Sequence, residues 1–184
     1  FDTGNLYVSV GIDRLDSLFF PRAGYYASLG HTISRNWLGS DTEFDQIDVD
    51  VIGAHSFGKH ALQGGLRYHV TSSGELPVQD RYRLGGRGRL AGFKRNELTG
   101  QHYAVVFAGY SYQLSDFFGR SALLGGTLEY GNAWERRPDM AFDAGILNGS
   151  AYVGYDSRIG PMLFGYGWRE GGEGLLFLEI GRPF

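Results

Sequence analysis

The stretch "LYVSVGID", residues 6–13, alternates apolar and polar side chains along its length. Leu6, Val8 and Val10 fall on one side of an extended chain, and the residues between them fall on the other. Successive side chains of a β-strand point to opposite faces of its sheet. This stretch therefore predicts a strand with one aliphatic face and one polar face.

The same period of two recurs along the chain, for example in "QIDVDVI" (residues 46–52) and "ALLGGTLEYG" (residues 122–131). No segment has helical periodicity, and the 30 glycines disfavour helices, because Gly costs about 1 kcal/mol per helical position relative to Ala. We predict an all-β, antiparallel fold with one domain over residues 1–184. The expected strands lie near residues 5–14, 24–34, 44–57, 60–71, 102–115, 121–134, 148–158, 161–169 and 175–184.

The chemistry of the two faces favours a transmembrane β-barrel, to which this chain contributes about eight or nine strands, over a soluble fold. One face carries small or ionisable residues such as Asp50, Arg67 and Glu129, which suit a wet lumen, while the other carries Leu and Val with aromatic residues near the segment ends. Most segments are about 9–11 residues long, as a tilted transmembrane strand requires. A soluble lipocalin-like binding barrel gives the same alternation with the faces inverted, so it remains an alternative.

Composition and motifs argue against several functional classes. The net charge of −3 gives no general case for nucleic acid, and no run of about 20 apolar residues predicts a transmembrane helix. The sequence lacks G-x-S-x-G and H-x-x-x-H, and cysteine is absent. We therefore expect no catalytic residue, cofactor or metal site. An outer-membrane barrel enzyme acting on lipid remains an alternative, but it would need a Ser/His/Asp cluster at one rim.

The glycine-rich stretch "GGRGRLAGFKRNELTG", residues 85–100, interrupts the alternation. Its glycines match neither the dinucleotide-binding nor the phosphate-binding spacing, and no βαβ context surrounds them. We predict that a long loop, residues 81–101, folds into the polar lumen, where glycines permit positive φ angles. The alternative is a solvated loop whose cations touch lipid phosphates.

The longer stretch "YRLGGRGRLAGFKRNELTGQHY", residues 82–103, resembles the long loop of BamA/TamA-type outer-membrane assembly and translocation barrels. That family's G-G-x-x-x-[VI]-R-G-[FY] element falls on Gly85, Gly86, Leu90, Gly92 and Phe93. The resemblance covers nearly the whole chain in family order. It also includes "GIDRLDSLFFPRAGYYASL" (residues 11–29), "LEYGNAWE" (128–135), "YDSRIGPMLFGYGW" (155–168) and "LFLEIGRPF" (176–184).

Within that superfamily, "LGGRGRLAGF" with "NELTGQHY" is most similar to the barrels of patatin-like proteins of the PlpD type. The resemblance implies a Gram-negative outer-membrane barrel that anchors, translocates or inserts a polypeptide. Its implied partners are outer-membrane lipid, the assembly machinery and an attached passenger such as a patatin-like lipase domain. No lipase chemistry is carried over, because that domain is not in this sequence. The resemblance also implies a C-terminal assembly signal on Leu178, Ile180, Gly181 and Phe184.

One residue departs from the family pattern. Ala91 replaces the loop arginine that meets an acidic strand residue in the family, whereas Glu129 holds the acidic position. We predict that Arg87 or Arg89 supplies the missing cation, with its guanidinium within about 4 Å of the Glu129 carboxylate. The alternative is that Glu129 is a solvated charge in the lumen.

The resemblance also implies a sixteen-stranded barrel, and the nine predicted strands match its C-terminal part. An open sheet edge in lipid would leave unpaired backbone groups that cost several kcal/mol each. The chain could be part of a longer protein, a small closed barrel, or one half of a homodimeric barrel. The start at Phe1 without a signal peptide favours the first of these.

Overall fold

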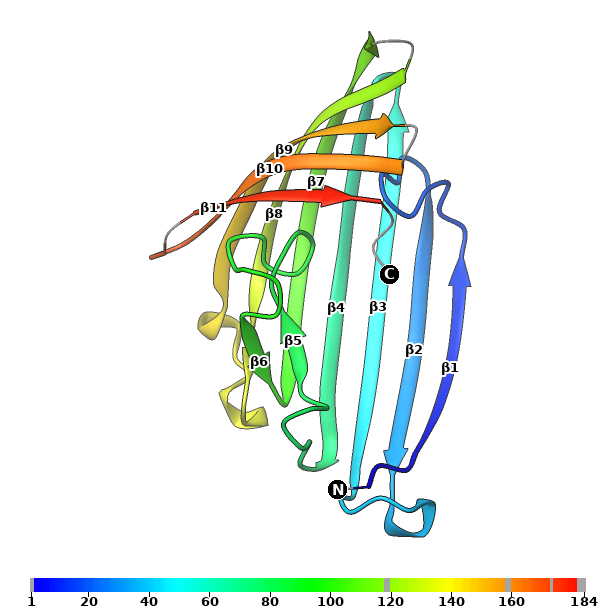
Figure 1. The fold of residues 1–184 in the computed structure, drawn as a ribbon, viewed down its shortest axis with the longest axis vertical. Helices are drawn as coiled ribbons and strands as arrows, with labels where there is room; N and C mark the ends of the chain where they lie inside the picture. Colours follow the sequence, from blue (N-terminus) through cyan, green and yellow to red (C-terminus); the bar gives the residue numbers. More distant parts are fainter. Residues whose placement is uncertain (1, 118–119, 158–159, 173, 182–184) are drawn as a thin grey trace.

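The computed structural model of the protein describes residues 2–117, 120–157, 160–172 and 174–181. Nine long strands form one sheet in the order β1-β2-β3-β4-β7-β8-β9-β10-β11 (Figure 1). They are β1 (Asn5–Asp13), β2 (Gly24–Ser34), β3 (Phe44–Phe57), β4 (His60–Gly74), β7 (His102–Phe117), β8 (Arg120–Trp134), β9 (Ile146–Ser157), β10 (Gly160–Arg169) and β11 (Leu175–Ile180).

Every neighbouring pair in this sheet is antiparallel, which confirms the predicted fold class. The segments predicted at residues 24–34 and 44–57 coincide with β2 and β3. Five short elements were not predicted: the strands β5 (Tyr82–Leu84) and β6 (Leu98–Gly100), which form a two-stranded sheet, and three 3-10 turns in the connections. These turns are η1 (Asn36–Leu38), η2 (Arg137–Asp139) and η3 (Phe142–Ala144).

The two faces of the sheet differ in exposure as the alternation predicts. We call the face that carries Val8, Leu66 and Leu128 the aliphatic face; these side chains are 63%, 37% and 56% exposed. On the opposite, polar face, Glu129 is only 1% exposed. Aliphatic rows on the outside of a curved sheet are the arrangement of a barrel wall whose outer surface meets lipid.

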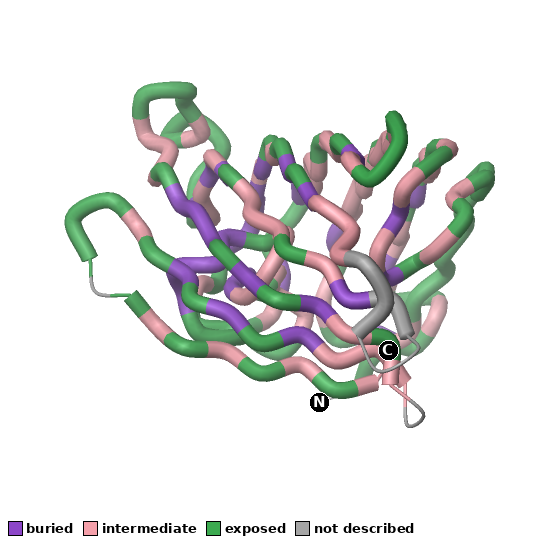
Figure 2. Tube along the Cα trace, turned by 90° about the horizontal axis from the view of Figure 1, so that it is seen from above, coloured by how far each residue is buried: buried purple, intermediate pink, exposed green. Residues whose placement is uncertain are grey.

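The sheet is strongly twisted and curved. In Figure 1 the strands turn from nearly vertical in β1–β4 to nearly horizontal in β10 and β11, and Figure 2 shows the curvature from above. Strand twist accumulates in one direction across a sheet, which produces such a turn. The strand order nevertheless runs from β1 to β11 without a pairing between them in the described part of the chain. Of the three arrangements that the sequence left open, the small closed barrel is therefore not formed by the described residues.

The connection between β1 and β2 reaches the strands at the other edge. Phe19 from this connection is 6% exposed and forms a hydrophobic cluster with Tyr152 of β9 and Leu163 of β10. A second cluster forms where the long loop meets β7; it includes Leu90 and Phe93. The buried apolar contacts therefore lie on the polar face of the sheet, where connecting segments pack against its concave side.

Among the residues that the structure describes, there is no helix of the length and apolar character needed to cross a membrane.

Candidate functional site

The long loop adopts an unusual backbone between β5 and β6. Gly85, Gly86, Gly88 and Leu90 all have positive φ angles, of 127°, 94°, 73° and 74°. Leucine rarely adopts a positive φ because its Cβ crowds the backbone. Consecutive amides in such conformations can converge on one anion. At Gly85 a side chain would also collide with the carbonyl of Lys94, so this position requires glycine.

The amides of the long loop converge on the Glu129 carboxylate. Gly88 donates its N–H to Oε1 at 2.9 Å, and Leu90 and Ala91 donate theirs to Oε2 at 2.5 and 2.8 Å. The Thr127 hydroxyl donates to Oε1 at 2.8 Å. Four donors therefore compensate a charge that is almost completely removed from water, and hydrogen bonds to an ionised acceptor are the stronger kind.

Neither Arg87 nor Arg89 forms the predicted ion pair with Glu129. The Arg87 Nε lies 3.4 Å from Oε2 of Glu179 in β11, and its guanidinium lies 5.1 Å from the centre of the Phe19 ring. In the described residues, no ion pair joins Glu129 to Arg87 or Arg89, and the 1% exposure of Glu129 also rules out a solvated charge. Both predictions for Glu129 are corrected: backbone amides hold its carboxylate.

A second attachment lies one residue further along the long loop. The Gly92 N–H donates to Asn148 Oδ1 of β9 at 3.1 Å, and the Asn148 side chain is fully buried. A Cβ on Gly92 would lie 2.5 Å from the Trp168 carbonyl carbon. Gly167 is equally restricted, because its Cβ would collide with the Ala91 oxygen. Glycines on both sides therefore allow the two backbones to approach.

A third attachment joins the long loop to Arg169 at the end of β10. The Arg169 guanidinium lies 4.1 Å from the centre of the Phe93 ring, and its Nη1 donates to Glu97 Oε1 at 3.1 Å. The Lys94 N–H donates to the other Glu97 oxygen at 2.6 Å. This amide, together with Arg169, lowers the pKa of the Glu97 carboxyl.

A charged cluster on β3 and β4 contacts the first strand of the long loop. The two ring nitrogens of His69 lie 2.8 Å from Asp48 Oδ1 and 3.1 Å from Asp50 Oδ2, and Arg67 donates to Asp50 at 2.9 Å. The Tyr82 hydroxyl donates to Asp48 at 2.9 Å. Burial, with the adjacent Asp48 carboxylate, raises the pKa of the Tyr82 phenol, which therefore keeps its proton and donates.

The long loop thus contacts strands β3, β8, β9, β10 and β11 of the large sheet through directional interactions. Of the five motif residues, Leu90 is fully buried, Phe93 is 6% exposed, and Gly92 adjoins the β10 backbone. Gly85 and Gly86 form the turn, with Gly86 donating to the Phe93 carbonyl at 3.0 Å. Sequence reasoning missed several contributors on the wall, namely Thr127, Asn148, Arg169 and Glu179. These residues alternate with exposed aliphatic residues along their strands, and this alternation could have indicated that they face the long loop.

The described residues of the expected C-terminal signal lie on or next to β11, which pairs only with β10 among the residues that the structure describes. Leu178 and Ile180 of β11 are 59% and 54% exposed on the aliphatic face. Gly181 has a φ of 84° and donates its N–H to the Pro161 carbonyl at 2.9 Å. Phe184 lies outside the described residues. Within the described part, no group of three His, Cys, Asp or Glu side chains could hold a metal ion.

A curved antiparallel sheet with an aliphatic outer face, an inner polar face and a loop fixed against that face defines the wall of a transmembrane β-barrel. A family model described as "Omp85 superfamily domain" matches residues 1–172. The chain belongs to the Omp85 superfamily, which confirms the expected BamA/TamA-type family and places the protein in the Gram-negative outer membrane.

A solved structure with the same fold is that of BamA from Haemophilus ducreyi lacking POTRA domains 1–3. The two are 18% identical, with a TM-score of 0.73 over 96% of this chain. The chain spans 40% of the BamA chain that it matches, so the likeness shows the fold of one part of that protein. No match was found among curated proteins.

Proposed function

We propose that this chain is part of an outer-membrane barrel that anchors a polypeptide and translocates it or inserts it into the membrane. The observation that carries the proposal is the attachment of the long loop to Glu129 within a wall of the Omp85 fold. A loop held by three backbone amides and a buried carboxylate braces the lumen without performing bond chemistry. In this role the long loop occupies the lumen and keeps the wall in shape.

The free edge of β11 is the proposed contact for an incoming strand. β11 pairs with β10 on one side only in the described residues, so its other edge offers unpaired backbone groups. An extended polypeptide can add to such an edge through main-chain hydrogen bonds. Within a membrane the drive to pair is strong, because lipid offers unpaired groups no hydrogen bonds.

Site-specific disulfide formation tests this contact, since the chain has no cysteine of its own. A Leu178→Cys variant is produced in a Gram-negative host together with an outer-membrane protein that carries one cysteine in its terminal strand. The matched control is Phe164→Cys on β10. Phe164 pairs directly with Leu178 on the same face and is 55% exposed, against 59% for Leu178.

We expect cross-linking at position 178 and none at position 164, because the β10 edge is already occupied. Heat-modifiable migration in detergent gels verifies that both variants are folded. Equal cross-linking at both positions, or none at position 178 in a folded barrel, contradicts the proposed strand contact.

We further propose that the polypeptide is an attached patatin-like lipase domain, on the basis of the resemblance of "LGGRGRLAGF" and "NELTGQHY" to barrels of the PlpD type. The test is the coding sequence of the complete protein. A hydrolase domain upstream of residue 1 supports the passenger, whereas a series of periplasmic repeats there excludes it and favours an assembly factor. The barrel itself is expected to have no enzymatic activity in either case.

A further inference from the structure

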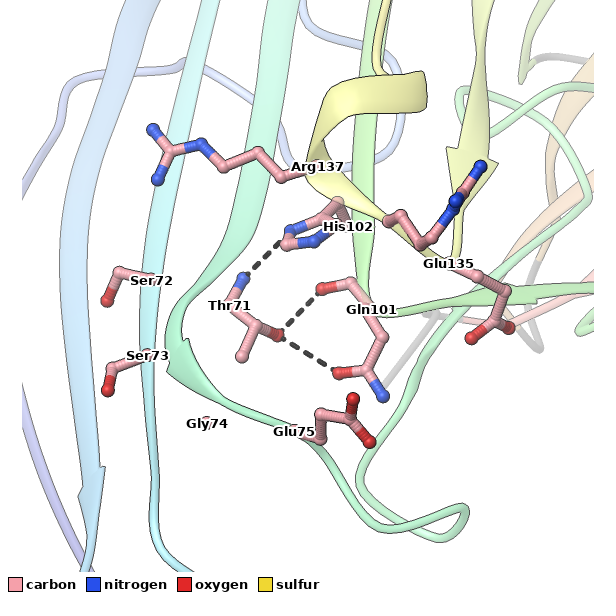
Figure 3. Close-up of a pocket in the computed structure, with 10 residues that line it drawn as sticks. Thr71, Ser72, Ser73, Gly74, Glu75, Gln101, His102, Glu135 and Arg137 are labelled. Atoms are coloured by element: carbon pink, nitrogen blue, oxygen red, sulfur yellow. Dashed lines mark hydrogen bonds between the residues drawn. The ribbon is translucent and has the colours of Figure 1, made fainter.

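Two adjacent cavities lie on the wall near the ends of β4, β7 and β8. The first, the polar cavity, has a volume of about 310 Å³, and its lining includes Ser72, Ser73, His102 and Arg137 (Figure 3). The second, the apolar groove, has a volume of about 290 Å³ and is lined by residues that include Ala104, Tyr130 and Trp134. Neither cavity includes the contacts of the long loop with Glu129, Asn148 or Arg169.

The apolar groove opens on the aliphatic face of the sheet. Val106, which lines the groove, is 46% exposed. Leu128, two residues before Tyr130 on the same face of β8, is 56% exposed. The connection between β8 and β9 folds back over this face to form one side of the groove. The Tyr130 hydroxyl donates to the Phe142 carbonyl, and the Asn132 side chain donates to the Ala144 carbonyl at 3.0 Å.

The polar cavity borders the groove directly. His102 lines the cavity and Trp134 lines the groove, and these two residues are opposite partners in the β7–β8 register. The polar cavity and the apolar groove thus meet at the His102–Trp134 pair. This pair lies near the end of the sheet where the longest connections between strands are found. In outer-membrane barrels the longer loops lie on the extracellular side. The His102–Trp134 pair therefore lies near the extracellular surface of the membrane, where lipid meets water.

Two side-chain donors at this boundary have no partner among the described residues. The Trp134 side chain is 8% exposed, and its buried Nε1 has no hydrogen-bond partner in the described residues. His102 Nδ1 accepts the Thr71 N–H at 3.2 Å, which places the ring proton on Nε2, a donor without an acceptor in the described part of the chain. For Trp134 Nε1, which is buried, the missing partner is costly, so a ligand acceptor would be favourable there.

The charges around the polar cavity leave one cation available. Arg136 is paired with Asp139 at 2.9 Å, and Glu135 is paired with Arg81 at 3.0 Å. Arg137 has no ion pair among the described residues, and Figure 3 shows its guanidinium extended beside the cavity. The carboxylate of Glu75 also borders the cavity, so the site selects for a group that can reach Arg137 and the His102 donor together.

We propose that the polar cavity and the apolar groove form one binding site for an anionic, phosphate-bearing lipid. The phosphate contacts Arg137 and His102, a polar atom of the linker accepts from Trp134, and an acyl chain occupies the groove. Charge-assisted hydrogen bonds suit the phosphate, and a groove that opens on the lipid-facing wall suits the chain. The site is independent of the proposed translocation of a polypeptide.

Fluorescence quenching by brominated lipid tests the proposal in the complete barrel reconstituted in vesicles. The chain has three tryptophans, so a W37F/W168F background leaves Trp134 as its reporter, with any tryptophan elsewhere in the complete barrel also replaced by phenylalanine. Brominated phosphatidylglycerol is included at a low fraction in an excess of unbrominated phosphatidylcholine. In parallel, brominated phosphatidylcholine is used at the same fraction. A brominated lipid that only surrounds the barrel quenches Trp134 fluorescence in proportion to its fraction in the vesicle. A brominated lipid that binds at the site quenches it more than that fraction predicts.

Two variants and two matched controls accompany the measurement. Ala104→Phe fills the groove, and its control Ala108→Phe introduces the same ring at an exposed position of the same face of β7. Arg137→Ala removes the proposed phosphate contact, and its control Arg95→Ala removes an exposed cation of the long loop. Heat-modifiable gel migration confirms the folding of each variant.

We expect phosphatidylglycerol to quench Trp134 more strongly than phosphatidylcholine. The Arg137→Ala substitution should weaken its relative binding about tenfold, which corresponds to about 1.4 kcal/mol. Ala104→Phe should abolish the excess quenching, and the two controls should retain it. Equal quenching by the two lipids, or a preference that survives both Arg137→Ala and Ala104→Phe in folded barrels, overturns the proposal.

Discussion

The Glu129 carboxylate accepts a hydrogen bond from the backbone amide of Ala91 at 2.8 Å. The residue that departs from the family pattern therefore still contacts the acidic strand residue, but through its main chain. A buried carboxylate can be held by amides as well as by a guanidinium, provided that enough donors converge on it. Here the positive φ angles of Gly88 and Leu90 direct two further amides to the same group.

The first prediction concerns the charge of Glu129. Glu129→Gln keeps the shape of the side chain but replaces one acceptor oxygen by an NH₂ group, which then faces backbone donors. We expect the free energy of unfolding to fall by about 1–3 kcal/mol, the usual cost of leaving buried polar groups unpaired. Trypsin should then cleave after Arg87 and Arg89 faster than in the wild type.

Glu170→Gln, at an exposed position of the β10–β11 connection, is the control and should leave both urea unfolding and cleavage unchanged. A Glu129→Gln protein with wild-type protection of the long loop would show that the amide contacts contribute little.

The second prediction restores the family residue. Ala91 is fully buried, and its oxygen lies close to the Gly167 backbone. An arginine side chain has no space there while the amides hold Glu129. Overpacking of this kind costs about 1–3 kcal/mol, so Ala91→Arg should destabilise the docked loop, whereas Ala91→Ser should have little effect. A more stable Ala91→Arg protein in urea unfolding would mean that the loop can readily adopt an arginine-mediated attachment.

The third prediction concerns the close approach of the long loop to β10. Gly167→Ala would force its new methyl group against the Ala91 carbonyl. We expect the loop to detach and trypsin sensitivity to rise, with a loss of stability of about 1–3 kcal/mol. Gly53→Ala on β3 is a suitable control, because a Cβ there meets nothing within 4 Å. Equal behaviour of the two variants would contradict the close packing between loop and strand.

The fourth prediction is a pH dependence of the attachment at Arg169. The pKa of Glu97 is lowered in the folded protein by the Lys94 amide and by Arg169. A lowered pKa stabilises the folded state above the ordinary pKa of the group, and this contribution is lost as the pH falls through the folded-state value. The protection factors of residues 93–97 against hydrogen exchange, which correct for the slower intrinsic exchange in acid, should therefore fall on acidification.

Glu97→Gln should remove this part of the pH dependence, because it removes the titrating group. If the variant and the wild type respond to acid in parallel, another carboxylate controls the attachment.

The fold could be predicted closely from the alternation of side chains, because a strand with one face in lipid and one face in a polar interior leaves a period of two in its sequence. Val8, Leu66 and Leu128 lie on the exposed face as expected. The strands β5 and β6 have three residues each. They are too short to leave such a pattern, so they were missed.

The partner of Glu129 could not be predicted in the same way. Its donors are backbone amides, which every residue except proline carries, so residue type gives no indication of them. The density of glycines in the long loop indicated positive φ angles, but not which amides would converge. Similarly, Arg87 pairs with Glu179, 92 positions away, and only the curvature of the sheet brings these two residues together.

The central claim is that the aliphatic face meets lipid and the polar face surrounds water. Leu29 and Ser28 of β2 are neighbours in the chain with side chains on opposite faces, and Leu29 is 51% exposed. Single cysteines at these positions are spin-labelled in vesicles, and collision rates with oxygen and with a water-soluble nickel complex are measured. We predict that the label at position 29 collides mainly with oxygen and the label at position 28 mainly with nickel. The reverse pattern would contradict the account.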